Sequence, residues 1–159
     1  MSPAYILRPA LEADFPVIRR IVSEMRINPM GLDWRRFILA CSATGGEIIG
    51  CGQIKPHKDG SRELASIAVI PVWRGQGIAR DIIQHLVDTE RSRPADGRPR
   101  LLYLTCRRHL GSFYEKFGFS VVLPAEMPRY FRRISRLVDV VQKIIRDEDS
   151  MLVMARRLN

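Results

Sequence analysis

A short glycine-containing segment has the residue types and spacing of an anion site. Residues 74–77 (Arg-Gly-Gln-Gly) follow an apolar run at 63–70 and precede a stretch whose apolar residues recur every three or four positions. A tight turn at the start of a helix leaves backbone N–H groups unpaired at the positive end of the helix dipole. The two glycines lack Cβ atoms, so a phosphate can approach the backbone closely, and Arg74 and Arg80 add positive charge. The segment therefore predicts a phosphate or pyrophosphate site between a strand and a helix.

Two common phosphate motifs fit this segment poorly. A P-loop needs GxxxxGK[ST], and no lysine in the chain is followed by serine or threonine. The dinucleotide motif GxGxxG begins at Gly75 but has Arg80 in place of its third glycine. From the residues of this segment alone, a turn that binds no ligand remains the alternative.

Apolar periodicity predicts the elements that position this turn. We expect strands at 5–7, 37–42, 47–54, 63–70, 101–105, 119–123 and 151–155, and helices at 12–25, 78–87, 111–117 and 130–145, with a short helical turn at 34–36. Hairpins come first and a strand–helix–strand crossover follows. This order predicts a mixed α/β sheet.

The turn also belongs to a longer pattern. Val69 and Pro71 precede Arg74, Gly77 and Ala79. The pattern resembles the acetyl-CoA motif Arg/Gln-x-x-Gly-x-Gly/Ala of the GNAT N-acetyltransferase superfamily. Downstream, residues 113–119 (Phe-Tyr-Glu-Lys-Phe-Gly-Phe) resemble the family's Tyr-x-x-x-Gly-Phe.

The resemblance covers essentially the whole chain and implies its fold and co-substrate. It implies one GNAT domain over residues 1–159, with a mixed central sheet of about six or seven strands, helices on both faces and a splay between the fourth and fifth strands. It implies acetyl-CoA as co-substrate and no metal. The residues implied to bind acetyl-CoA are Ile67, Ala68, Val69, Arg74, Gly75, Gln76, Gly77, Ile78, Ala79 and Arg80.

The same resemblance implies two catalytic side chains. Glu63 lies 11 residues before Arg74, where the histone-acetylating branch of the family has its catalytic glutamate. A carboxylate there can take a proton from the acceptor ammonium, directly or through water. The alternative is an exposed strand-end residue beside Arg62. Tyr114 is implied to be the general acid for the coenzyme A thiolate, because a phenol stays protonated at neutral pH; the alternative is an aromatic residue that only packs its helix.

The chain departs from the family pattern at one position. Many members have Asn seven residues before this tyrosine, in contact with the coenzyme's arm, whereas this chain has Arg107. Arg107 and Arg108 could instead reach a coenzyme phosphate or lie in solvent. His57, His85 and His109 show no spacing typical of a metal site or a catalytic triad.

Composition limits the classes of protein. The chain has 159 residues, 46% of them apolar and 27% charged, which excludes a disordered, collagen-like or coiled-coil protein. Three cysteines without CxxC spacing argue against a zinc site or a disulfide framework and favour buried free thiols. No apolar run approaches the ~18 residues that span a bilayer, and the N-terminus has no secretory signal. We therefore expect a cytoplasmic protein without membrane contact.

The net charge of +9, carried mostly by arginine, suggests a polyanionic partner, although a genome that favours arginine codons explains it equally well. Family resemblance assigns acceptor specificity to residues 25–34 and 124–131, where arginines surround apolar side chains, so an acidic amine or peptide fits better than a polyamine.

These patterns together predict an N-acetyltransferase that moves an acetyl group from acetyl-CoA to a primary amine of a protein, peptide or small molecule by direct attack in a ternary complex. The alternatives are a GNAT-fold module that senses acyl-CoA without turnover or, less favoured, a basic RNA-binding domain, which would lack the aromatic motifs of common RNA modules. The sequence leaves monomer and homodimer open.

Overall fold

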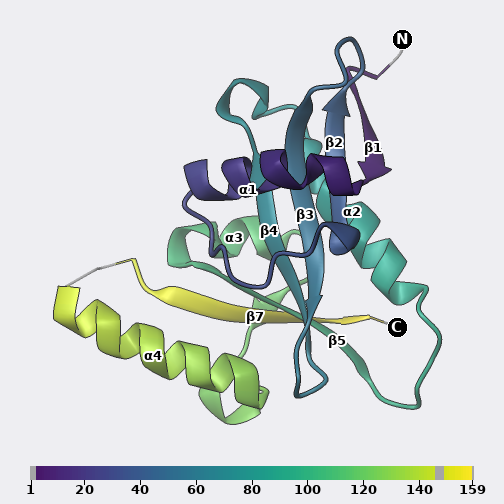
Figure 1. Ribbon diagram of the computed structural model, residues 1–159. Coiled ribbons are helices and arrows are strands. Elements are labelled where there is room, and N and C mark those ends of the chain that lie inside the picture. Colours follow the sequence, from purple (N-terminus) through teal and green to yellow (C-terminus); the bar gives the residue numbers. More distant parts are fainter. Residues whose placement is uncertain (1–2, 146–148, 159) are drawn as a thin grey trace. The chain divides into compact units, whose positions relative to one another are not determined.

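The computed structural model describes residues 3–145 and 149–158 and contains a mixed seven-stranded sheet with the order β1-β2-β3-β4-β5-β7-β6 (Figure 1). Its strands are β1 (Tyr5–Pro9), β2 (Phe37–Ser42), β3 (Ile48–Pro56), β4 (Arg62–Val69), β5 (Arg100–Arg107), β6 (Ser120–Val121) and β7 (Met151–Leu158). Its α-helices are α1 (Phe15–Glu24), α2 (Ile78–Arg91), α3 (Gly111–Glu115) and α4 (Arg129–Ile145). This mixed α/β architecture, with β4 parallel to β5, confirms the predicted fold class.

The structure differs from the predicted elements at the strand expected over 119–123, of which only Ser120–Val121 forms β6, and at the first helix. Residues Glu12–Asp14 form a 3-10 turn, and α1 begins only at Phe15. Pro16 has no N–H to donate to the carbonyl of Glu12, so a regular α-helical turn cannot start at Glu12. The predicted turn at Trp34–Arg36 is also a 3-10 turn. The last strand runs three residues further than predicted, to Leu158, because it pairs with β5 along the whole length of that strand.

The residue contacts divide into two compact units, which are described separately. Unit 1 contains residues 3–55 and Leu64–Arg93, and unit 2 contains Pro56–Glu63, 94–145 and 149–158. Strand β4 supplies residues to both units. Arg62 and Glu63 pair in parallel with Leu102 and Tyr103 of β5 inside unit 2, whereas the rest of β4 belongs to unit 1. The splay expected between the fourth and fifth strands would involve this later part of β4.

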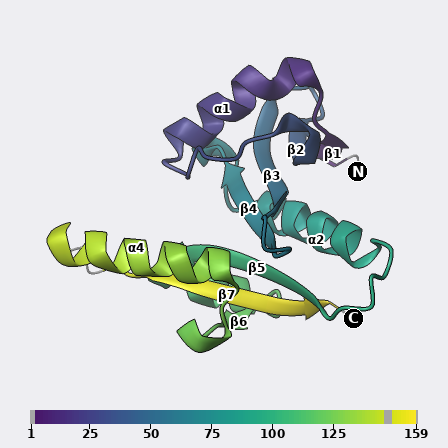
Figure 2. The same cartoon turned by 60° about the horizontal axis from the view of Figure 1, so that its bottom comes forward.

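In unit 1, helices cover both faces of the strands (Figure 2). Helix α1 buries Ile18, Ile21 and Val22 in a core with residues of β2 and β3. Helix α2 packs on the opposite face, where Gly50 and Gly52 of β3 leave room for its side chains. Because alternate residues of a strand point to opposite faces, Cys51 faces α1 while its glycine neighbours face α2.

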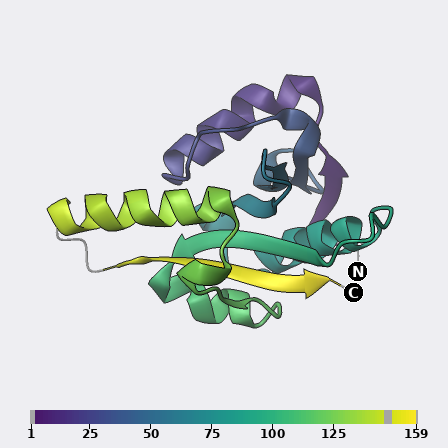
Figure 3. The same ribbon diagram turned by 90° about the horizontal axis from the view of Figure 1, so that it is seen from below.

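In unit 2, β7 lies between β5 and β6 and pairs antiparallel with both. Helix α4 lies along one face of these strands (Figures 2 and 3), where Phe131 and Met127 are buried with Tyr103 and Val153. Cys106 and Met154 belong to the opposite set of alternating residues, and their sulfur atoms are 3.8 Å apart. The side chain of Leu152 on that face lies against Gly111, the first residue of α3. Helices α3 and α4 thus occupy opposite faces of the β5–β7 pair.

Among the described residues, no helix combines the length and the apolar character that crossing a bilayer requires. The three cysteines, Cys41, Cys51 and Cys106, are buried free thiols, as the sequence predicts.

The packing of α2 on β3 predicts that Gly52→Ala will destabilise the protein. A Cβ at Gly52 would lie 2.6 Å from Cδ1 of Ile67 and 2.7 Å from Cγ2 of Ile82, so the core must shift to admit it. Overpacking of this kind costs about 1–3 kcal/mol. The measurement is the free energy of unfolding from urea titration.

Gly45→Ala is the matched control. A Cβ at Gly45 would meet nothing within 4 Å, so the change should leave the free energy of unfolding within about 0.5 kcal/mol. Equal effects of the two substitutions would contradict the packing argument.

Candidate functional site

The glycine-containing turn in unit 1 has the backbone geometry of an anion site. Gly75 and Gly77 have φ values of +79° and +81°, a left-handed conformation that costs glycine little. Gly77 is the N-cap of α2, and no side chain of the described residues caps the helix there. The first N–H groups of α2 are therefore available to a ligand with negative charge. A Cβ at Gly75 would meet nothing within 4 Å, so the space over the turn is open.

The two arginines predicted to flank this turn are placed differently. Nε of Arg74 donates to the carbonyl of Val69 at 3.1 Å, and its guanidinium also contacts Sδ of Met25. Arg74 thus ties the turn to the end of β4. The side chain of Arg80 is 71% exposed and lies 3.4 Å from the carboxylate of Asp81. Arg80 is the better placed of the two to meet a phosphate.

Strand β4 contains a backbone irregularity just before Ile67. Ser66 has a φ of +58°, which an L-residue in a strand adopts only under constraint, and it is buried. Its hydroxyl accepts a hydrogen bond from Nε2 of Gln53 at 3.0 Å, and its carbonyl accepts one from the Cys51 thiol. Strained backbone positions of this kind cluster at active sites and affect the direction of the groups that follow. Here those groups belong to Ile67, Ala68 and Val69.

Glu63 is buried and forms a close pair with a histidine in unit 2. Its Oε2 lies 2.7 Å from Nε2 of His57, and both side chains are about one-tenth exposed. The alternative of an exposed strand-end residue is therefore wrong for Glu63. A buried carboxyl group requires hydrogen-bond partners, and His57 is one.

The imidazole of His57 is held by aromatic and acidic neighbours. It stacks on the Tyr130 ring with centroids 3.5 Å apart and meets the edge of Phe131. Asp59 accepts a hydrogen bond from the N–H of Tyr130 at 2.9 Å and two from Ser61. Burial works to raise the pKa of Asp59, but these hydrogen bonds lower it below the ordinary value. Burial and the charges of Glu63 and Asp59 raise the pKa of Tyr130 to about 12.

Tyr114 lies in α3, half-buried against Phe113 and Phe119. Burial, and to a smaller extent the neighbouring Cys106, raises its pKa to about 12, so the phenol is protonated at neutral pH. Glu63 belongs to the cluster on the α4 face of β5, whereas Tyr114 belongs to the opposite face with Cys106. The two predicted catalytic side chains are therefore on opposite faces of β5.

In unit 2, polar residues at the end of β5 and just after it interact with the two residues that precede β7. Arg107 lies 3.9 Å from the Asp149 carboxylate, and Nδ1 of His109 lies 2.6 Å from it. Arg108 donates to the Ser150 hydroxyl at 2.7 Å. Within residues 3–145 and 149–158, His, Cys, Asp and Glu side chains form no group of three that could hold a metal ion.

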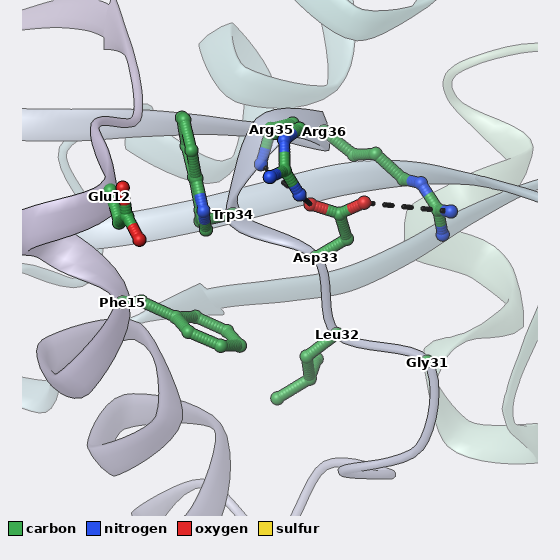
Figure 4. Close-up of a pocket in the computed structure, with 8 residues that line it drawn as sticks. All are labelled: Glu12, Phe15, Gly31, Leu32, Asp33, Trp34, Arg35 and Arg36. Carbon is green, nitrogen blue, oxygen red and sulfur yellow. Dashed lines mark hydrogen bonds and ion pairs between the residues drawn. The ribbon is translucent and has the colours of Figure 1, made fainter.

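The first segment assigned to acceptor specificity borders a pocket of about 510 Å³ in unit 1 (Figure 4). Asp33 lies between the guanidinium groups of Arg35 and Arg36, at 3.3 and 3.7 Å, and Arg35 lies over the Trp34 ring. The lining is completed by Glu12, Phe15, Gly31 and Leu32. Two arginines and two carboxylates give this pocket no net charge.

The second segment assigned to acceptor specificity is part of unit 2. Met127 and Phe131 are core residues. Arg132 donates to the main-chain carbonyls of Pro124, Ala125 and Met127. Tyr130 and Phe131 are the residues of this segment that contact His57 beside Glu63.

Sequence reasoning assigned no role to His57 and placed Tyr130 only in a segment for acceptor specificity, so it missed the contacts that His57 makes with Tyr130 and with Glu63. A signal for His57 was present, because Asp59-Gly60 forms the turn and the N–H of His57 bonds to the carbonyl of Ser61 at 2.9 Å. That turn makes residue 63 a diagonal cross-strand neighbour of residue 57, within reach of long side chains. No local signal brings Tyr130 there, because its position depends on the packing of α4.

The left-handed backbone at Ser66 predicts an unusual order of stability among variants. Ser66→Ala keeps the left-handed conformation and loses the hydrogen bond, whereas Ser66→Gly loses the same bond but relieves about 1–2 kcal/mol of backbone strain. The glycine variant should therefore unfold at higher urea concentration than the alanine variant. At Ser120, in β6, glycine should instead be less stable than alanine by about 0.5–1 kcal/mol. If the glycine and alanine variants had the same order of stability at both positions, the left-handed conformation assigned to Ser66 would be contradicted.

The partly or fully buried phenols predict a loss of stability at high pH. The pKa is about 12 for Tyr5, Tyr114 and Tyr130 and is also raised for Tyr103 by burial. Because an unfolded phenol ionises near pH 10, the stabilisation is full below that pH and is lost as the pH rises through the folded values. Native phenolate absorbance should appear mainly above pH 11, and that of urea-unfolded protein near pH 10. Coincident titrations would contradict this prediction.

Comparison with known proteins identifies the family. The family described as "Acetyltransferase (GNAT) domain" matches residues 33–121, which is more than half of the chain. No curated protein was found to match the chain at a significant level.

Solved structures share the fold at low identity. N-acetylglutamate synthase from Neisseria gonorrhoeae, complexed with coenzyme A and N-acetyl-glutamate, matches all of this chain and 36% of its own, with 19% identity and a TM-score of 0.72. Rv2747 from Mycobacterium tuberculosis, in complex with CoA, matches 97% of this chain and 99% of its own, with 20% identity and a TM-score of 0.70. Naa50 from Arabidopsis thaliana, in complex with a bisubstrate analogue, matches 97% of this chain and 99% of its own, with 13% identity and a TM-score of 0.62.

The chain spans about a third of the length of the N-acetylglutamate synthase chain and nearly all of the other two. From its match over residues 33–121, the chain belongs to the GNAT acetyltransferase family.

Proposed function

We propose that residues 1–159 form an N-acetyltransferase domain that moves an acetyl group from acetyl-CoA to a primary amine by direct attack in a ternary complex. The observation that carries this proposal is the buried Glu63 carboxylate at the start of β4, hydrogen-bonded to His57. Burying a carboxylate is costly, and a sensor that only binds acyl-CoA has no use for a base at this position.

Unit 1 would hold the co-substrate. The uncapped N-terminus of α2, the open turn at Gly75 and Gly77, and the exposed Arg80 fit a pyrophosphate. The backbone of Ile67, Ala68 and Val69, which follows the irregularity at Ser66, would pair with the pantetheine arm. An N–H group of this strand would donate to the oxyanion that forms during transfer.

Glu63 would begin the chemistry by taking a proton from the acceptor ammonium. The neutral amine nitrogen then forms a bond to the acetyl carbonyl carbon. As the carbon–sulfur bond breaks to release the thiolate, the nitrogen loses one proton to solvent and the neutral amide forms. Both steps need only proton transfer and electrostatic stabilisation, which this chain's side chains can supply.

The raised pKa of Tyr114 changes the role expected for it. A thiol ordinarily has a pKa of about 8.5, so full proton transfer from a phenol with a pKa of about 12 would be uphill. A hydrogen bond from the phenol to the developing thiolate has no such cost. We therefore assign Tyr114 as the donor that stabilises the leaving thiolate, whose final proton comes from solvent.

The acceptor remains an amine of a protein, peptide or small molecule. Because the charged side chains of the Figure 4 pocket cancel, the pocket adds no support for an acidic acceptor. The test should therefore use acidic, neutral and basic amines. The solved relatives suggest two members of the panel, free glutamate and a peptide that begins Met-Val-Asn-Ala-Leu.

The experiment that tests this function measures acetyl-CoA binding by calorimetry and transfer by release of free thiol, with the product identified by mass spectrometry. Binding together with transfer to any amine supports the enzyme. Binding without transfer to any member of a broad panel would indicate a sensor. RNA binding that falls steeply with salt, without acetyl-CoA binding, would indicate the nucleic-acid alternative.

Tyr114→Phe is predicted to lower kcat about 10- to 100-fold, because it removes one donor to a developing charge. The KM for acetyl-CoA should stay within about twofold, since the phenol acts mainly after the thioester is bound. Tyr5→Phe is the matched control, because it removes another phenol with a pKa of about 12, one that donates to Asp81 of α2. Full turnover by Tyr114→Phe would refute the role assigned to this residue.

A further inference from the structure

Glu63 could act as the proposed base without a histidine partner, yet His57 contacts one of its carboxylate oxygens. A carboxylate has two oxygens, and His57 occupies only one of them, Oε2, at 2.7 Å. Oε1 is left to accept a proton from elsewhere. This inference rests on the proposed function and assigns a part of it to a residue outside the family motifs.

The imidazole is fixed on more than one side. Tyr130 lies flat against it with an interplanar angle of 18°, and Phe131 meets it edge-on at 84°. The N–H of His57 bonds to Ser61 across the turn. A ring held by its own backbone, by a stack and by an edge contact cannot rotate freely, so it fixes the carboxylate that it contacts.

The charged and titratable groups that face His57 within unit 2 come from three elements. Glu63 lies on β4, Asp59 in the turn, and Tyr130 on α4, with Asp59 also bonded to the N–H of Tyr130. Two of these groups are acidic and none of them is basic. Their charge favours an imidazole that donates from Nε2 to the carboxylate over one that accepts from it.

We propose that His57 is the positioning residue of the acetyl transfer: its Nε2–H holds Oε2 of Glu63, so that Oε1 faces the acceptor amine as the proton acceptor. Tyr130 and Phe131 hold the imidazole plane, and Asp59 anchors the first turn of α4 that carries both aromatic rings. His57 does not touch the substrate and acts only through Glu63.

The test compares two substitutions of His57 in the full chain. His57→Gln retains an amide N–H near the position of Nε2, whereas His57→Leu keeps a similar volume without a donor. His57→Leu should lower kcat about 10- to 100-fold, the loss expected when a catalytic group is misplaced. His57→Gln should recover kcat to within about threefold of the unsubstituted protein, and both should leave the KM for acetyl-CoA within about twofold.

A double-mutant cycle separates positioning from a general loss of structure. If His57 acts through Glu63, His57→Leu should have almost no further effect on kcat in a Glu63→Gln background. His85→Leu is the matched control, because His85 is an exposed histidine in α2, and it should leave kcat unchanged. Additive losses in the cycle, or equal losses in the leucine and glutamine variants, would overturn the proposal.

Nitrogen-15 NMR of the unsubstituted protein supplies a measurement that does not depend on folding of a variant or on turnover. The proposal requires a proton on Nε2 of His57, and an unprotonated Nε2 would overturn it.

Failure of the proposed function can be distinguished from failure of the positioning role of His57. If the unsubstituted protein transfers acetyl to no amine, the proposed function fails; if it transfers and His57→Leu matches it, only the positioning role fails.

Discussion

The burial of one carboxylate constrains much of unit 2. Glu63 lies in the short parallel segment between β4 and β5, where Arg62 and Glu63 pair with Leu102 and Tyr103. An ionised carboxylate there would cost several kcal/mol without a partner. The turn that brings His57 back over β4, and the aromatic start of α4 that covers His57, together make this burial tolerable. The site and the stability of this part of the fold therefore depend on the same contact.

Unit 1 contains a second local constraint, at Ser66. A left-handed serine in a buried strand is unfavourable by itself, and the hydrogen bonds from Gln53 and Cys51 hold it in place. The residues that follow are those expected to contact the pantetheine arm. Strain at one residue thus sets the direction of the backbone groups that the proposed chemistry needs.

Several arginines make contacts within the protein. Arg74, Arg132 and Arg156 donate to main-chain carbonyls, while Arg8 and Arg93 pair with the carboxylates of Asp14 and Glu90. The guanidinium group suits such contacts because it presents several donors in a fixed plane. These arginines have roles within the fold, so the arginine content by itself does not require a polyanionic partner.

The sequence alone determined the order of the elements, the turn at Gly75 and Gly77, and the family, because these depend on local periodicity and on spacing along the chain. It also placed Glu63 on the correct strand, but it could not decide whether that side chain was exposed. The pairing with His57 follows from a short turn that the sequence marks at Asp59-Gly60. The burial of Glu63 and the stack of Tyr130 on His57 depend on residues up to 73 positions apart, joined by the packing of α4 on β5 and β7. Only the tertiary structure could decide them, since contacts between distant segments leave no local pattern in the sequence.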